Sequence, residues 1–288
     1  MKLFAALMIV FMCVISFATA SGATLSSAGG NLSAKSDKKD ELPKIAILYI
    51  ATGRYIVFWD EFYKKMEQNF LPDYPKTYFI WTDATDKKFP SNVNRIYQKQ
   101  LEWPLITLKR FEMFMEQVEQ LKDYDYIYFL NANMLPMRPV GDEILPTEEQ
   151  GVTVVMHPGY YKVSNNHLPY DRNPNSEAYI PLGQGKMYAM GGFNGGRAKA
   201  YLKLIRDLNQ ATEKDAQNQI MARWHDESHL NKYILDKNPL VLSPAYGYPE
   251  EGYHSLIEFK DNYKMLILDK RKFGGHNYLR GIIDKPKP

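Results

Sequence analysis

The sequence predicts an α/β fold in which a mixed, mostly parallel sheet is flanked by helices. Residues 126–130 form an unbroken apolar run, typical of a strand that is buried on both faces. The first half of the chain alternates strand and helix patterns in the order β-α-β-β-α-β. Apolar side chains recur every fourth residue from Phe58 to Phe70, as in a helix packed against a sheet.

The individual elements follow in chain order. Strands are expected at residues 44–50, 78–81, 93–97 and 126–130, and helices at about residues 58–70 and 105–122. In the second half we expect strands at 151–156 and 263–268, and helices at 197–208 and through Leu230, Tyr233 and Ile234. The polar segment 159–177 follows a strand end, which is typical of a lid or binding loop.

The N-terminal segment predicts export or membrane anchorage. Lys2 precedes an apolar run that ends in Ala-Thr-Ala, so residues 1–20 are expected to be a signal peptide or a signal anchor. Because no Lys or Arg follows until Lys35, the rest of the chain is expected outside the cytoplasm, with the cytoplasmic face as the alternative. Residues 21–42 are predicted to be a flexible stalk. The only cysteine is Cys13, so we expect no disulfide in the remaining domain.

Composition argues against a nucleic-acid partner. The 288 residues carry a formal net charge of only +3, which gives no global field for a polyanion. The chain also lacks an RNA-binding aromatic motif and a block rich in Lys and Arg.

Two asparagines follow the 126–130 strand directly. Asn131 and Asn133 would emerge at the carboxyl end of a sheet strand, where ligands of such folds gather. Neutral amides hold a hard cation poorly, so a phosphate ligand there would need Lys and Arg partners. The basic cluster of the C-terminal segment 270–288, with its Gly-Gly joint, could deliver them as a mobile tail. The alternatives are an ordinary turn for the asparagines and a solvated tail for the cluster.

Residues 224–231 concentrate Trp, Asp, Glu, Ser and two His side chains. A helix N-terminus explains the acids and the serine through capping and the helix dipole. His225 and His229 are also four residues apart, as in zinc metalloproteases, although Asp stands where that motif requires Glu. A third ligand would be His254 or His276. A zinc hydrolase is therefore kept as an alternative.

With these residues the chain resembles glycosyltransferase family six, which includes the ABO histo-blood-group transferases and the α-1,3-galactosyltransferase. The resemblance covers about residues 44–280, and its most specific element is the segment 224–231. Further support comes from Tyr-Ile-Pro at 179–181, Leu-Ser-Pro at 242–244 and His-Pro-Gly at 157–159. Asn-Ala-Asn at 131–133 replaces the Asp-x-Asp of vertebrate members and is similar to the metal-independent bacterial branch.

The resemblance implies a GT-A fold for a single catalytic domain spanning residues 43–288. Its activity would be the transfer of GalNAc or Gal from a UDP-sugar to O3 of a β-galactoside, with retention and an α-1,3 linkage. The acceptor could carry fucose, as in the H antigen. No divalent metal is expected, with Mn²⁺ as the alternative. An inactive sugar- or nucleotide-binding module is the rival function.

The resemblance also implies roles for individual residues. Glu227 would be the catalytic carboxylate, and His157 and Trp224 would hold the acceptor. Because Gly192 lacks a Cβ atom, it would leave room for an acetamido group, which favours GalNAc. The donor would be contacted by Thr52, Tyr55, Ile106, Arg110, Asn131, Asn133, Met190, Gly191, Gly192, Asp226, Arg280 and either Lys270 or Lys272.

Overall fold

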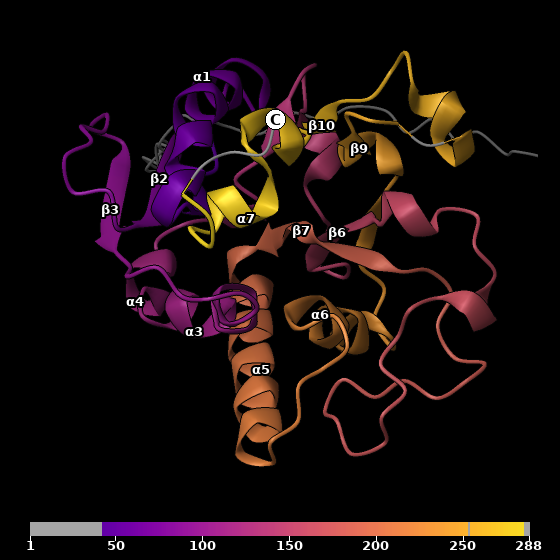
Figure 1. Cartoon of the computed structure of the whole chain (residues 1–288). Helices are drawn as coiled ribbons and strands as arrows, with labels where there is room; N and C mark the ends of the chain where they lie inside the picture. Colours follow the sequence, from indigo (N-terminus) through magenta and orange to yellow (C-terminus); the bar gives the residue numbers. More distant parts are fainter. Residues whose placement is uncertain (1–41, 253, 285–288) are drawn as a thin grey trace, which may run out of the picture. The chain divides into compact units, whose positions relative to one another are not determined.

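A seven-stranded sheet in the order β3-β2-β1-β4-β7-β6-β8 organises the structure (Figure 1). The computed structural model describes residues 42–252 and 254–284, so the predicted signal segment and nearly all of the predicted stalk lie outside it. Every strand of this sheet is parallel to the others except β7, which pairs antiparallel with β4 and β6. The strands are β1 (Ile45–Ile50), β2 (Lys76–Thr82), β3 (Val93–Tyr97), β4 (Tyr126–Leu130), β6 (Val152–Met156), β7 (Ala189–Arg197) and β8 (Leu240–Leu242). The predicted order β-α-β-β-α-β of the first half is confirmed.

Helices cover both faces of this sheet, and each face has its own hydrophobic core. On one face, Phe62 and Met66 of α1 (Trp59–Asn69) are buried against β1 and β4. On the other face, Phe111 of α3 (Arg110–Met115) packs with α5 (Ala198–Gln217) and α6 (Asp226–Ile234). Figure 1 shows α3, α4 and α5 together on one side, away from α1. A small second sheet joins β5 (Met134–Pro136), β9 (Tyr248–Pro249) and β10 (Met265–Ile267).

The expected helix at 105–122 is broken into three short helices, so that prediction was wrong in its continuity. These are α2 (Leu105–Leu108), α3 and α4 (Val118–Leu121). The backbone leaves helical geometry at Lys109 (φ −88°, ψ 12°) and at Gln117 (φ −110°, ψ 8°). The apolar spacing survives the breaks, because Phe111, Phe114 and Val118 are all buried. The periodicity of apolar residues therefore predicted which face is buried, but it did not predict the breaks in the helix.

The described part of the C-terminal segment, residues 270–284, is folded onto the body of the domain. Residues Lys270–Phe273 form a 3₁₀ turn and Gly275–Leu279 form α7, where a mobile tail was predicted. Arg54 donates hydrogen bonds to the carbonyl oxygens of Tyr278 (2.8 Å) and Ile283 (2.7 Å). The rings of Phe273 and Phe58 are 4.5 Å apart between centroids. Within the part of the chain that the structure describes, no helix has the length and apolar character needed to cross a membrane.

Candidate active site

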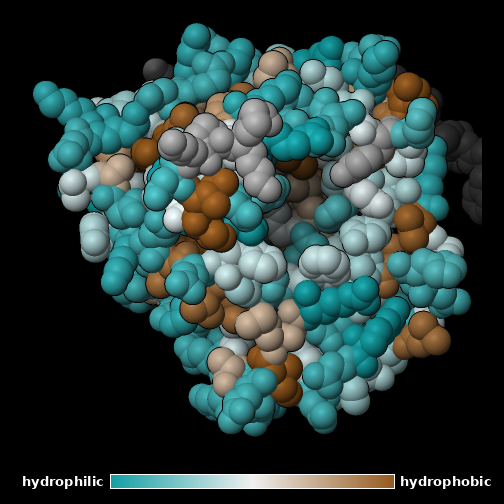
Figure 2. Space-filling model, viewed as in Figure 1, coloured by the Kyte–Doolittle hydropathy of each residue, from teal (hydrophilic) through white to brown (hydrophobic). Residues whose placement is uncertain are grey.

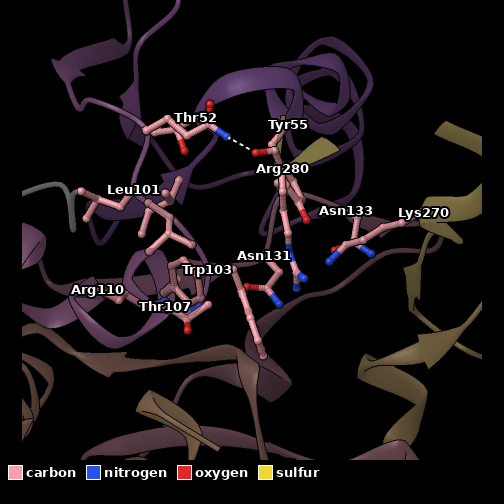
Figure 3. A pocket seen from close by; sticks show the side chains of 15 residues that line it. Thr52, Tyr55, Leu101, Trp103, Thr107, Arg110, Asn131, Asn133, Lys270 and Arg280 are labelled. Atoms are coloured by element: carbon pink, nitrogen blue, oxygen red, sulfur yellow. Dashed lines mark hydrogen bonds between the residues drawn. The ribbon is translucent and has the colours of Figure 1, made fainter. Parts of the chain in front are cut away.

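A cavity lies at the carboxyl ends of β1 and β4, where the two parallel strands lead into loops (Figure 3). Thr52 follows β1 and Asn131 follows β4, so the sheet itself brings these two loops together. Among the described residues that line the cavity, none is acidic and three are cationic. Figure 2 shows that this face of the molecule is hollowed near its centre. The lining residues are Ile50, Thr52, Tyr55, Gln100, Leu101, Trp103, Ile106, Thr107, Arg110, Phe129, Asn131, Ala132, Asn133, Lys270 and Arg280.

The structure brings eight of the sequence-predicted donor residues into this cavity wall. The other predicted residues do not line the cavity; three of them belong to β7 itself. The eight are Thr52, Tyr55, Ile106, Arg110, Asn131, Asn133, Lys270 and Arg280; the others are Met190, Gly191, Gly192, Asp226, Glu227, His157, Trp224 and Lys272.

Two of the cations in the wall, Lys270 and Arg280, form no ion pair with any carboxylate of the described residues. The Lys270 ammonium lies 5.3 Å from the centre of the Tyr55 ring, and the Arg280 guanidinium lies 4.5 Å from that of Trp103. Burial lowers the pKa of Lys270 to about 8, and the positive charge of Arg280 acts in the same direction. Two close cations without a counter-ion make the cavity suited to an anionic ligand.

The structure distinguishes between the two candidate lysines. Lys272 is ion-paired with Glu250, with 2.6 Å between Nζ and Oε1, and it does not line the cavity. Lys270 lines the cavity and lies near Asn133 in Figure 3. The geometry therefore favours Lys270 as the lysine available to a donor phosphate.

Both predicted asparagines face the cavity, and each is also tied to another segment. Asn133 donates a hydrogen bond from Nδ2 to the carbonyl oxygen of Leu268 (2.8 Å), and the Leu268 N–H donates to the Asn133 carbonyl (2.8 Å). The Asn131 N–H donates to the carbonyl oxygen of Gly192 on β7 (2.8 Å). The amide pair thus joins the end of β4 to β7 and to the start of the C-terminal segment.

Arg110 is buried, with only 6% of its surface exposed. Its Nη1 atom lies 2.6 Å from Oδ2 of Asp226 and donates a 2.9 Å hydrogen bond to the carbonyl oxygen of Gly191. The guanidinium also lies 4.1 Å from the centre of the Phe129 ring. Because its charge is already balanced by Asp226, Arg110 contributes less free positive charge to the cavity than Lys270 and Arg280 do.

Glu227 lies directly behind Gly191. Its Oε2 atom accepts a 2.7 Å hydrogen bond from the Gly191 N–H. Burial raises the pKa of Glu227 to about 7, although the Gly191 N–H acts in the opposite direction. The nearby Tyr188 hydroxyl is buried and has no hydrogen-bond partner of normal geometry among the described residues. A buried carboxylate beside an unused donor is a typical arrangement for a site that completes its hydrogen bonds with substrate.

The predicted acceptor residues lie on the Glu227 side of β7. The Nδ1 atom of His157 accepts a hydrogen bond from the Gly159 N–H (3.0 Å), and burial lowers the pKa of His157 to about 4. A neutral imidazole with Nδ1 occupied carries its proton on Nε2, which makes Nε2 a donor. The His157 and Tyr188 rings are 5.9 Å apart between centroids. Trp224 is 41% exposed, which leaves its ring available to an apolar sugar face.

The space next to Gly192 is filled by neighbouring side chains, and the preference for GalNAc based on the missing Cβ atom stays a prediction. A Cβ atom at Gly192 would lie 2.7 Å from Nδ2 of Asn131 and 2.9 Å from Cε of Met190. Met190 itself is 5% exposed and belongs to the core. The absent side chain makes room for the Asn131 amide.

The two histidines of the 224–231 segment do not form a shared metal site. The His225 ring packs edge-on against Trp103, with 5.2 Å between centroids. The His229 ring is buried, and its Nε2 lies 3.5 Å from Oδ2 of Asp215. Among residues 42–252 and 254–284, no group of three or more His, Cys, Asp or Glu side chains is placed to hold a metal ion. His254 and His276 therefore complete no cluster with this pair.

Sequence reasoning missed several residues of the site. Trp103 covers Arg280, and Gln100 donates a hydrogen bond from Nε2 to the Arg280 carbonyl oxygen (2.7 Å). Tyr188 reaches Glu227, and Asn194 supports Gly191 from within β7. Only Asn194 left a signal in the sequence, as a polar residue inside an apolar, glycine-rich segment.

The fold and the site together define a glycosyltransferase of the GT-A type, with a cation-lined cavity at the carboxyl ends of parallel strands and the buried carboxylate of Glu227. A family model described as glycosyltransferase family 6 matches residues 38–261. The chain is 34% identical over 230 residues to the O-antigen biosynthesis glycosyltransferase WbnI of Escherichia coli, a match covering 79% of this chain and 95% of that one. The chain belongs to glycosyltransferase family 6.

Vertebrate relatives are similar over most of this chain but are longer. The histo-blood group ABO system transferase 2 of Rattus norvegicus is 33% identical over 226 residues, covering 74% of this chain and 66% of the relative. The globoside α-1,3-N-acetylgalactosaminyltransferase 1 of Gallus gallus is 31% identical over 214 residues, covering 70% of this chain and 61% of the relative. Family membership implies a nucleotide-sugar donor and a glycan acceptor, and it replaces the zinc-hydrolase alternative.

Proposed function

We infer that this chain is a retaining transferase that moves GalNAc or Gal from a UDP-sugar to O3 of a β-galactoside, without a divalent metal ion. The observation that carries the proposal is the pairing of a cation-lined, acid-free cavity with the buried carboxylate of Glu227 behind Gly191. A binding module needs the cavity but has no use for a carboxylate whose pKa burial raises to about 7.

The cavity supports binding of the diphosphate and departure of UDP. The growing negative charge on the leaving group requires fixed positive charge, which Lys270 and Arg280 supply from the folded C-terminal segment. Thr52, Tyr55 and Ile106 also line the cavity, and the uridine would lie against them. The donor sugar would then extend toward Gly191 and Gly192 of β7, beside which Glu227 lies.

Glu227 is the proposed catalytic carboxylate. It is suited to bonding to the anomeric carbon as UDP leaves, or to stabilising oxocarbenium charge from the same face. Either course ends in retention, because the acceptor hydroxyl attacks the anomeric carbon from the face that UDP has left. In the covalent course this attack breaks the bond to Glu227 and releases the carboxylate. Trp224 and His157 are proposed to hold the acceptor galactose by ring stacking and by the Nε2–H donor.

Independence from metal is supported by the donor set of the cavity. The asparagine pair is neutral, and Asn133 already uses its Nδ2 in a hydrogen bond to Leu268. Divalent cations such as Mn²⁺ favour charged oxygen ligands, and no carboxylate is among the described residues of the cavity wall. Lys270 and Arg280 supply the positive charge that the diphosphate needs.

The proposal is tested by product analysis with two donors. UDP-GalNAc and UDP-Gal are each incubated with lactose and with fucosylated lactose, and the linkage and anomeric configuration of the product are determined by NMR. An α-1,3-linked product, lost about a hundredfold or more in Glu227→Gln, is expected. Binding of UDP-sugar with neither transfer nor release of UDP would establish the inactive-module alternative instead.

A further inference from the structure

A buried polar network that joins β7 to α5 reaches the carbonyl oxygen of Gly191, the residue whose N–H binds Glu227. Asn194 is 1% exposed, and its Nδ2 donates a 3.0 Å hydrogen bond to the carbonyl oxygen of Gly191. Tyr201 of α5 is fully buried, and its hydroxyl donates a 2.6 Å hydrogen bond to Oδ1 of Asn194. Because this hydroxyl occupies Oδ1, the amide is held with Nδ2 directed at Gly191.

The same glycine binds Glu227. The N–H of Gly191 donates to Oε2 of Glu227, while its carbonyl oxygen accepts from Asn194 and from Arg110. Gly191 and Gly192 are adjacent glycines, and without support such a pair has unusual backbone freedom. The carbonyl belongs to the peptide group that follows the Gly191 Cα atom, and the N–H belongs to the peptide group that precedes it. Holding both groups fixes the two backbone dihedrals of Gly191, so loosening the carbonyl lets the N–H that meets the carboxylate reorient.

We propose that Asn194, held in place by Tyr201, is a positioning residue that orients Gly191 and thereby sets the geometry and proton affinity of the Glu227 carboxylate. This inference rests on the proposed catalytic role of Glu227. A polar pair buried at the centre of a sheet is costly unless it is fully hydrogen-bonded, and here each polar group of the chain Tyr201, Asn194, Gly191 and Glu227 has its partner.

Other charged and titratable groups also face Glu227 and must stay constant in a test. Asp226 precedes it on α6 and raises the pKa of Glu227, while Arg110 from α3 lowers it. Tyr188, which lies just before β7, also lowers the pKa of Glu227. Asn194 and Tyr201 do not contact the Glu227 carboxylate in any hydrogen bond or ion pair of the described residues, so replacing them leaves these groups in place.

The experiment measures the ionisation of Glu227 directly. Wild type, Asn194→Leu and Tyr201→Phe are labelled with ¹³C at glutamate carboxyls, and the Glu227 signal is identified by its absence from Glu227→Gln. Weakening the Gly191 hydrogen bond is expected to raise the pKa of Glu227 by roughly 0.5 to 1 pH unit in Asn194→Leu and by less in Tyr201→Phe. In transfer assays, kcat should then fall about three- to tenfold at pH 6 and stay near wild type at pH 8.5.

Thr212→Val is the matched control, because it removes a buried hydroxyl of α5 that bonds only to the Leu208 carbonyl. It should change neither the titration nor the pH profile. An unchanged Glu227 titration in folded Asn194→Leu or, if that variant does not fold, in Tyr201→Phe would overturn the inference. The two proposals can fail separately, because the NMR titration does not depend on turnover. Full activity of Glu227→Gln would refute the proposed catalytic role of Glu227, whereas the effect of Asn194 on Glu227 would still be measured by the titration.

Discussion

Replacing Gly192 with alanine tests what the space beside this glycine is for. The new Cβ atom would lie 2.7 Å from Nδ2 of Asn131 and 2.9 Å from Cε of Met190. Both atoms are ends of flexible side chains, so they can move aside, but the Asn131 amide must then shift within the cavity wall. Because the Gly192 backbone is not in the left-handed region, alanine also loses less entropy on folding than glycine does.

The expected cost in stability is therefore modest. Overpacking by one methyl group, partly offset by the backbone term, should lower the free energy of unfolding by about 1 kcal/mol and Tm by about 2–4 °C. Gly195→Ala on the same strand provides the contrast. Its Cβ atom would lie 2.2 Å from Cδ1 of Tyr128 and 2.5 Å from the Ile127 carbonyl oxygen, and backbone cannot move aside. That variant should lose about 3 kcal/mol or more, or fail to fold.

The functional readout is the kcat/KM of each UDP-sugar. If the space serves Asn131, Gly192→Ala should weaken UDP-GalNAc and UDP-Gal by similar factors, because both share the disturbed cavity wall. The double variant Asn131→Ala/Gly192→Ala should be more stable than additivity predicts, by about 1 kcal/mol, since the crowding is gone. A fall in kcat/KM of about tenfold or more for UDP-GalNAc alone, without the coupling in stability, would refute the reasoning. It would show instead that the space beside Gly192 accommodates the acetamido group.

Three further predictions concern charge. Lys270→Met and Arg280→Met should each lower kcat about a hundredfold or more, because each removes a positive charge that stabilises the departing UDP. Lys272→Met breaks only the surface ion pair with Glu250 and should change kcat less than about threefold. Equal losses of all three variants in fluorometric UDP-release assays would contradict this. Folding raises the pKa of Glu227 from 4.5 to about 7, so the stability of the wild type falls as pH rises through this range. Relative to wild type, Glu227→Gln should therefore be more stable by about 1–3 kcal/mol at pH 8 and equally stable at pH 4. Melting curves with no such pH dependence would show that the carboxyl is not buried as described. Transfer should survive dialysis against EDTA, and strict restoration by Mn²⁺ would show that the asparagine pair works with a metal.

Much of the fold was predictable from the sequence because strong local patterns agree with the tertiary structure. The apolar run of β4 and the alternating strand and helix patterns around it predicted the parallel half of the sheet. The short interruptions at Lys109 and Gln117 were not predictable, because an apolar face can continue across a break in the backbone.

The candidate site was predictable where function follows from position at a strand end. Asn131 and Asn133 reach the cavity for this reason. The partners across the sheet were not predictable, because they depend on which side chains meet in three dimensions. Arg110 is paired with Asp226 and Gly192 is covered by Asn131, although more than fifty residues separate each pair along the chain. Residue spacing carries no information on such encounters.

Arg54 connects the first loop of the domain to its last residues, and this has a practical consequence for producing the protein. The guanidinium binds the carbonyl oxygens of Tyr278 and Ile283 and lies 3.6 Å from Asp284. Only four residues would separate this contact from a purification tag fused after Pro288, so the bulk of the tag could pull Arg280 away from the cavity. Recombinant material intended for assays or crystallisation should carry its tag before the catalytic domain, or have a C-terminal tag removed by a protease.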